Sequence, residues 1–332
     1  MAVSIEDIKK LRSITGAGLA DVKKALTEAE GDFDKAKDLL RERGLAIAAK
    51  RSDRETSNGC VLVKNVNGFA AMIALKCETD FVANGADFIK LTSDILDAAI
   101  AAKAKTVEEV KALKLADGTD VQAAVTHRSG ITGEKMELDG YNVLEGENIE
   151  TYDHMGKHTL ATMVQLNKPF PEVGHKIAMQ VAAMKPIALD EAGVPQEVKD
   201  KELEVAIQKT KDEQIEKAAE AAVKKAGLNP NLVDSEEHIE SNIKKGWLTR
   251  EDADKAVQIK KEAAEKKAAN MPEQMIQNIA KGRLAKFMKE NCLVDQEFQF
   301  GDGDKETVAE YLKKADKDLK IVAYKRFTLA AE

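Results

Sequence analysis

The sequence predicts an α+β protein built from more than one domain. Two apolar runs, Cys60 to Val66 and Phe69 to Cys77, the first of them rich in β-branched valine, flank Asn67-Gly68, which is the strongest short signal for a β-hairpin. Long charged, alanine-rich stretches elsewhere have helical periodicity. At 332 residues the chain exceeds the usual size of a single hydrophobic core, so two or more domains are expected.

The N-terminal segment, residues 1–55, predicts a three-helix module followed by a linker. Ser4 is expected to cap the first helix and Asp32 the third, because their side chains accept hydrogen bonds from free backbone amides. Gly44 is expected to end the third helix, since glycine is favoured just past a helix C-terminus. A charged helical linker, Ala46 to Glu55, then leads to the main body.

The main body is expected to contain two α+β lobes. Residues 56–168 would form the first lobe, a small antiparallel sheet covered by helices, and residues 169–200 with 271–332 would form the second. The expected strands after the hairpin are Glu134 to Leu144, Glu150 to Tyr152, Thr159 to Leu166, Glu297 to Phe300 and Lys320 to Leu329; the expected helices are Ala86 to Lys103, Val107 to Leu115, Val121 to Arg128, Pro171 to Met184 and Glu306 to Ala315, with a further helix beginning near Pro272.

Residues 201–270 predict a projecting antiparallel helical hairpin inserted in the second lobe. Its long helices are interrupted by Gly227 to Pro230 and by Gly246-Trp247, with an extra helix from Glu236 to Lys245. The tip is either a solvated spacer or a second binding surface around Trp247. A single aromatic side chain in a charged tip is no apolar patch, which favours the spacer.

Composition limits the classes of function. The net charge of −7 and the pI near 5.5 argue against affinity for nucleic acid through neutralised phosphates and favour a protein partner. The N-terminus has no apolar signal segment and no stretch approaches the length of a membrane span, so a cytoplasmic protein without membrane contact is expected. The three cysteines, Cys60, Cys77 and Cys292, are expected to be reduced, although Cys60 and Cys77 could face each other across the hairpin.

The segment Thr79 to Gly85 forms the corner between the hairpin and the next helix, and Phe81 on it has two interpretations. In the first, Thr79 or Asp80 caps a short turn and Phe81 packs beneath the helix. In the second, Phe81 is an exposed knob that enters a partner, with the Asp80 carboxylate beside it. A chain that is only 4% aromatic has few such side chains available.

Little in the sequence predicts an enzyme, a metal site or a bound cofactor. No phosphate-binding loop, dinucleotide-binding glycine pattern, nucleophile elbow or zinc-protease motif occurs. His154 and His158 are separated by Gly156 in a strand-rich region, which does not suit metal ligation. A thiol hydrolase using Cys77 with His154 as base is the weakest hypothesis, because reactive thiols require an accessible, electropositive site.

Four separated motifs carry a resemblance to a known family. In chain order they are Thr15-Gly16-Ala17-Gly18, Thr79-Asp80-Phe81-Val82, Tyr152-Asp153-His154 and Ile177-Ala178-Met179. With them the chain resembles the bacterial elongation factor Ts family, the guanine-nucleotide exchange factors of the translational GTPase elongation factor Tu. The resemblance covers most of residues 1–200 and returns from about Gln274 to the C-terminus.

The resemblance implies a ubiquitin-associated-like N-terminal module, a coiled-coil hairpin, and elongation factor Tu, GDP-bound and nucleotide-free, as the partner. It implies no cofactor, no catalytic residue and no direct contact with nucleic acid. It also favours the exposed interpretation of Phe81. The residues implied to dislocate the Mg²⁺ ion of the GTPase are Thr79, Asp80, Phe81 and Val82, and further contacts are implied for Lys9, Arg12, Leu19, Ala20, Lys176 and Gln180.

The chain departs from the family pattern at several points. Ala20 is smaller than the methionine common there, and some relatives have histidine where this chain has Lys176 and Gln180. The helical hairpin is longer than usual, and some relatives continue with a further helical module where this chain stops. The alternative function is a helical adaptor without exchange activity, in which the N-terminal module binds a small fold and the hairpin spaces it from a second partner.

Overall fold

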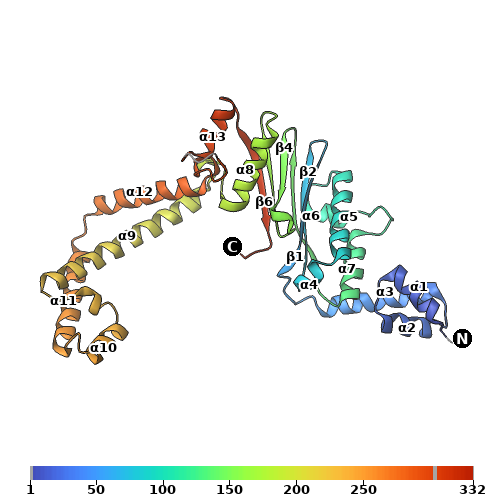
Figure 1. Cartoon of the computed structure of the whole chain (residues 1–332), viewed down its shortest axis with the longest axis horizontal. Helices are drawn as coiled ribbons and strands as arrows, with labels where there is room; N and C mark the ends of the chain where they lie inside the picture. The colour runs from blue at the N-terminus through green and yellow to red at the C-terminus, as the bar shows by residue number, and fades with distance from the viewer. Residues whose placement is uncertain (1–2, 302–304, 332) are drawn as a thin grey trace. The chain divides into compact units, whose positions relative to one another are not determined.

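The computed structural model describes residues 3–301 and 305–331, and confirms the α+β class. The described chain forms two compact units (Figure 1). The first unit runs from the N-terminus to Leu189 and resumes at Glu297, and the second comprises Asp190 to Gln296. The predicted division into four domains stays a prediction.

The first sheet of the first unit contains the predicted hairpin. Strand β1 (Asn58–Val66) pairs antiparallel with β2 (Phe69–Cys77), and β2 pairs antiparallel with β3 (Met136–Glu145). At the turn, Asn67 and Gly68 have φ angles of 51° and 79°. Positive φ at both central positions matches the strand twist of a two-residue hairpin, so the hairpin prediction is confirmed.

The second sheet has a pairing that the sequence order does not indicate. Strands β4 (Ile149–Asp153), β5 (Leu160–Leu166) and β6 (Ile321–Thr328) form it in that order, all antiparallel. The expected strand positions are right to within two residues, but β4 and β5 do not join the hairpin in one sheet. They form a separate sheet with β6, in which β5 lies between β4 and β6, because strand pairing can join chain segments that are far apart in the sequence.

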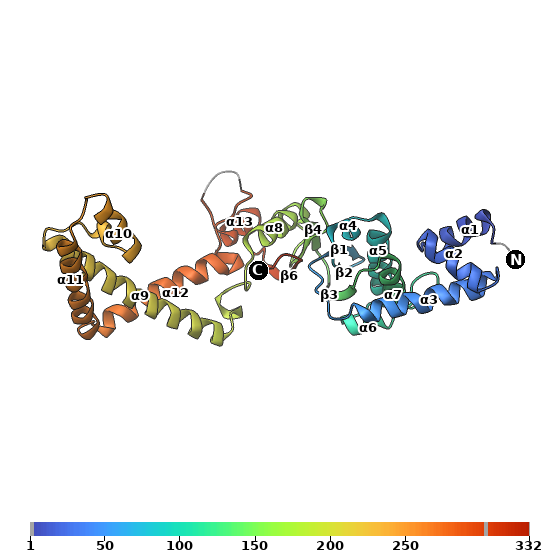
Figure 2. The ribbon, with the colours of Figure 1, turned by 90° about the horizontal axis from the view of Figure 1, so that it is seen from below.

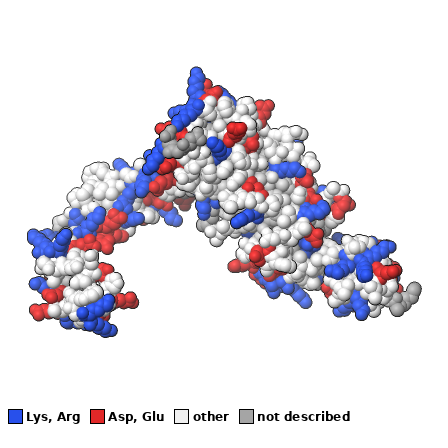
Figure 3. Space-filling view, viewed as in Figure 1, with Lys and Arg blue, Asp and Glu red and all other residues white. Residues whose placement is uncertain are grey.

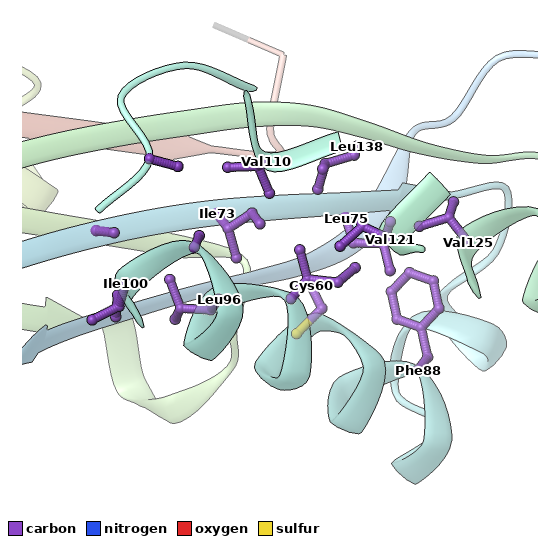
Figure 4. Close-up of a cluster of buried hydrophobic side chains, with 14 of the residues drawn as sticks. Cys60, Ile73, Leu75, Phe88, Leu96, Ile100, Val110, Val121, Val125 and Leu138 are labelled. Carbon is purple, nitrogen blue, oxygen red and sulfur yellow. The ribbon is translucent and has the colours of Figure 1, made fainter. Parts of the chain in front are cut away.

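The two sheets and their helices form four layers. Helices α5 (Ala86–Ala102) and α7 (Val121–Thr132) and the short α6 (Val107–Lys111) cover one face of the first sheet, and α8 (Pro171–Met184) covers the outer face of the second. Figure 4 shows Phe88, Leu96 and Ile100 in the buried cluster between α5 and the first sheet. The central β2 alternates between two cores: Phe69, Ala71, Ile73 and Leu75 face the helices, and Ala70, Met72 and Ala74 face the second sheet.

The N-terminal module consists of α1 (Ile5–Thr15), α2 (Leu19–Glu28) and α3 (Phe33–Lys50). Both predicted caps are confirmed: the Ser4 hydroxyl accepts from the amide of Asp7 at 3.0 Å, and the Asp32 carboxylate accepts from the amides that follow it. The module has its own small core, which includes Leu11, Val22, Leu26, Ala36 and Leu40.

The prediction that Gly44 ends the third helix is wrong. Helix α3 continues through Gly44 to Lys50 and so includes the first part of the predicted linker. Gly44 is buried inside the helix and lies against Gly130 of α7. Gly44 allows a close crossing of two helices and does not end its own helix. The local sequence cannot distinguish these two roles of a glycine.

The second unit is built from long helices. Helix α9 (Gln196–Lys225) packs along both α11 (Arg250–Ala269) and α12 (Glu273–Asn291), and α10 (Glu236–Lys244) lies at the tip. Arg283 of α12, which the sequence assigned to the second lobe, pairs with Glu213 of α9 at 2.6 Å. Basic and acidic side chains are interspersed along α9 and α12 on the face drawn in Figure 3.

The remaining elements complete the chain. Helix α13 (Val308–Ala315) packs against α8 in the first unit. Thr307 and Glu310 form a capping box at the start of α13. The predicted strand Glu297 to Phe300 is wrong, since only an isolated bridge between Glu297 and Thr307 forms there. Short 3₁₀ helices occupy His154–Gly156, Glu191–Gly193, Pro230–Leu232 and Leu293–Asp295.

Candidate functional site

Phe81 projects from a single turn of helix at the end of the hairpin. Helix α4 (Asp80–Ala83) follows β2 directly, and its turn exposes Asp80 and Phe81 while Val82 and Ala83 pack on the core below. Phe81 is 86% exposed. The interpretation that packs Phe81 beneath the next helix is therefore wrong. Such an exposed phenylalanine is unusual, because most phenylalanine side chains are buried.

Thr79 fixes the start of this turn. Its hydroxyl accepts from the amide of Val82 at 3.3 Å, which confirms the predicted cap. The same hydroxyl donates to the Glu134 carboxylate at 2.6 Å, and the Thr79 amide donates to the other carboxylate oxygen at 3.1 Å. Glu134 follows the C-terminus of α7, so the corner is held from outside as well as by its own cap.

Glu78 forms a second anchor just before the corner. Its carboxylate pairs with Arg54 at 2.9 Å and Arg51 at 3.4 Å, and accepts from the Lys135 amide at 2.6 Å. Burial alone would raise the pKa of Glu78, but the hydrogen bond from Lys135 and the two guanidinium groups lower it below the ordinary 4.5. Glu78 is therefore a charged anchor at neutral pH.

The predicted contacts in the N-terminal module lie on a separate surface of the first unit. Lys9 and Arg12 are exposed on α1, and Leu19 and Ala20 are exposed at the start of α2. Leu19 is 57% exposed at the first position of α2, directly after the capping residue Gly18. An exposed leucine in a module that also exposes two cations suits a contact with a protein surface.

The two predicted residues of α8 differ in what they can contact. Lys176 is half-buried, with its ammonium nitrogen 5.8 Å from the centre of the Tyr311 ring. Gln180 is fully buried; its amide donates to the carbonyl of Glu297 at 3.1 Å and accepts from the amide of Gln299 at 3.0 Å. Gln180 thus holds a neighbouring segment in place, and its burial leaves no surface for the predicted partner contact.

The histidines near the second sheet are partnered within the chain. Asp153 accepts from both the amide and Nδ1 of His158, at 3.1 and 2.5 Å, while Tyr152 Oη and His154 Nδ1 lie 3.1 Å apart. In the described part of the chain, no cluster of His, Cys, Asp or Glu is arranged to hold a metal ion. The segment from Tyr152 to His158 is therefore held by hydrogen bonds between its own residues.

The cysteines lie in environments that suppress their chemistry. Cys60, Cys77 and Cys292 are free and buried. In the hairpin register Cys60 lies opposite Leu75 and Cys77 opposite Asn58, so the two thiols do not face each other across the hairpin. Burial, with a smaller contribution from the Glu134 charge, raises the pKa of Cys77 to about 12. The thiolate that a thiol hydrolase requires is disfavoured.

Sequence reasoning missed the residues that fix the corner. Glu134, Arg51 and Arg54 are ordinary charged residues with no motif around them, and only the fold brings them to Thr79 and Glu78. No local signal in the sequence identifies them.

Among residues 3–301 and 305–331, no helix combines the length and apolar character needed to cross a bilayer.

Comparisons with known proteins show which family the chain belongs to. The family model described as elongation factor TS matches residues 78–226 and 205–331. The chain is 64% identical over 333 residues to an elongation factor Ts of Bacteroides fragilis, 62% identical over 332 residues to one of Phocaeicola vulgatus, and 40% identical over 333 residues to one of Porphyromonas gingivalis. Each match covers all of both chains. The chain belongs to the elongation factor Ts family.

Proposed function

We propose that this protein is the guanine-nucleotide exchange factor of elongation factor Tu, promoting GDP release by disturbing the partner's Mg²⁺ site. The observation that carries the proposal is the 86% exposed Phe81 on a corner anchored at Thr79 and Glu78. Membership of the elongation factor Ts family supports the identity of the partner. The protein acts by binding and not as an enzyme.

The mechanism follows from how a GTPase holds its nucleotide. In a GTPase, Mg²⁺ bridges the nucleotide phosphates to the protein with near-ideal octahedral geometry, so a small displacement of the groups around the ion weakens nucleotide binding. Phe81 enters between elements beside the metal, and the Asp80 carboxylate changes the polar surroundings of the ion. Binding of this protein and binding of GDP then weaken each other equally, and incoming nucleotide expels the factor.

The energy required implies a broad interface. Moving an equilibrium from almost fully nucleotide-bound to almost fully factor-bound takes about 5.5 kcal/mol. Burial of one phenylalanine contributes about 1.5–3 kcal/mol. The remainder of the binding free energy is proposed to come from Lys9, Arg12, Leu19 and Ala20 in the module and from Lys176 in α8. Val82 is proposed to hold the turn from beneath.

The cellular setting follows from the same proposal. The partner is elongation factor Tu in its GDP-bound and nucleotide-free forms, and the site of action is the cytoplasm. The acidic balance, with a net charge of −7, supports a mode of action without direct contact to nucleic acid or a membrane.

Stopped-flow release of a fluorescent GDP from elongation factor Tu tests the proposal. The parent protein should accelerate release, and Phe81→Ala should reduce that acceleration with or without Mg²⁺. Asp80→Ala should reduce it much less when Mg²⁺ is absent, because Asp80 acts through the surroundings of the ion. Trp247→Ala is the matched control, since Trp247 is the exposed aromatic residue of the second unit.

The outcomes separate the proposed function from the alternative. Equal release rates for the parent and both corner variants would show that the corner has no part in exchange. A folded parent protein that binds elongation factor Tu without accelerating release would favour the adaptor function.

A further inference from the structure

We propose that helix α3 is a rigid strut that holds the N-terminal module in one orientation relative to the Phe81 corner, and that Gly130 is a positioning residue for exchange. The positioning role rests on the proposed function, whereas the strut itself does not. Helix α3 runs from the module to α7 in both Figure 1 and Figure 2.

The crossing of α3 and α7 is made at two glycines. A Cβ atom added to Gly130 would lie 3.0 Å from the carbonyl carbon and 3.1 Å from the carbonyl oxygen of Gly44, and closer still to its Cα. The backbones of the two helices are therefore in direct contact, and alanine at position 130 does not fit. Glycine inside a helix is destabilising by about 0.5–1 kcal/mol relative to alanine, so its presence in both helices at one crossing indicates a packing role.

The glycine-rich turn of the module also lies close to α7. A Cβ atom added to Gly16 would lie 3.5 Å from Cδ1 of Ile131 and 4.0 Å from a guanidinium nitrogen of Arg128. The turn between α1 and α2 therefore lies close to α7, in addition to the direct packing of α3 on α7. This second close approach, separate from the glycine crossing, restricts pivoting about that crossing.

Both crossing helices continue directly to the corner. Just beyond the end of α3, Arg51 and Arg54 pair with Glu78 at 3.4 and 2.9 Å. Just beyond the end of α7, Glu134 binds Thr79 at 2.6 Å, and its own carbonyl accepts from Ser129 at 2.5 Å. Two consecutive residues before the Asp80–Phe81 pair are therefore anchored to the two helices that hold the module.

The consequence is a fixed geometry between two binding surfaces. Leu19 lies on the module and Phe81 on the corner, and a rigid connection lets both engage one partner without loss of orientational freedom on binding. When two surfaces engage together, the second binds as an intramolecular event at high effective concentration. If the crossing of α3 and α7 were loosened, the gain in effective concentration would be lost, although every side chain that contacts the partner would still be present.

Distance measurement by electron spin resonance tests the strut without reference to exchange. Spin labels are placed at Lys23→Cys on the module and Lys90→Cys on α5, both exposed, while the native cysteines stay buried. The parent should give a narrow distance distribution, and Gly130→Ala a broad one with unchanged helix content. Gly282→Ala is the matched control, because the space around Gly282 of α12 is open.

The same variants then test the positioning role. Gly130→Ala should weaken affinity for nucleotide-free elongation factor Tu by about tenfold or more, and Gly282→Ala should not change it. In addition, Leu19→Ala and Phe81→Ala should be coupled in the parent and additive in the Gly130→Ala background.

A broad distribution in the parent, or a narrow one in Gly130→Ala, would overturn the strut. A broadened distribution with unchanged affinity would overturn the positioning role. If the parent itself fails to accelerate GDP release, the proposed function fails, while the distance measurement still decides whether the strut exists.

Discussion

Glu134 binds Thr79 at two atoms, accepting from its amide at 3.1 Å and from its hydroxyl at 2.6 Å. The hydroxyl also accepts from the amide of Val82, so one side chain joins the cap of α4 to the end of α7. The exposed Phe81 is therefore presented on a turn that is held at its first residue. A contact made by a prepared side chain loses less ordering entropy on binding.

Thr79→Ala is expected to disturb this turn although it leaves Phe81 unchanged. The substitution removes the cap and the hydroxyl contact with Glu134, and loss of an N-cap costs about 1 kcal/mol. The unfolding free energy should fall by about that amount, measured by denaturant titration. GDP release should slow as well. Thr79→Ser keeps the hydroxyl and should behave like the parent; equal effects of both substitutions would argue against the cap.

Phe81 and Phe88 provide a matched pair of phenylalanines for a stability test. Phe81 is exposed, whereas Phe88 is fully buried under the first sheet. Phe81→Ala should change the unfolding free energy by no more than about 0.5 kcal/mol, as surface changes usually do. Phe88→Ala should lower it by about 3–5 kcal/mol, as for a large core truncation. A large loss of stability in Phe81→Ala would mean that Phe81 belongs to the core.

Much of the fold was predictable where the signal is local. The turn Asn67-Gly68 and the caps Ser4, Asp32 and Thr79 act on residues within a few positions of themselves, and the structure has all of them as expected. Local chemistry of this kind is written in the sequence directly.

Several of the failures concern partners far apart in the chain. Gly44 was expected to end a helix, because its close contact with Gly130 has no sequence signal. The resemblance implied a partner contact for Gln180, and the sequence does not reveal that the segment at Glu297 covers this side chain. The family motif indicated Phe81, but its anchors at Glu134 and Arg54 become visible only in the folded chain.

The buried thiols predict how stability depends on alkaline pH. Burial raises the pKa of Cys60 and Cys77 to about 12, from an ordinary 9.0. The folded chain therefore keeps protons that the unfolded chain loses above pH 9.0. The thiols' contribution to stability is complete below pH 9.0 and falls as the pH rises toward 12.

Thiolate absorbance in the ultraviolet measures this effect. At about pH 10 the folded protein should show little thiolate, and unfolding in denaturant should release the signal. The exposed Lys23→Cys variant should add one thiolate in the folded state, which calibrates the measurement. A thiolate signal from the folded parent equal to that of the unfolded chain would contradict the burial of these thiols.

Replacing residues 227–246 of the helical tip with a short Gly/Ser turn should leave GDP release within a few-fold of the parent. The ion pair between Glu213 and Arg283 lies outside this segment, so α9 and α12 should still pair. The tip has a small core of its own, in which Val223 and Leu248 pack against the replaced residues. The variant therefore also needs Val223→Gln and Leu248→Gln, which prevent newly exposed apolar side chains from causing association.

Exchange should survive in this tip variant, because the proposed contacts with elongation factor Tu all lie in the first unit. Phe81→Ala, measured in parallel, shows that the assay detects a loss. If exchange collapsed in a tip variant that circular dichroism shows to be folded, the tip would have to contact the GTPase, and the spacer interpretation of this segment would be wrong.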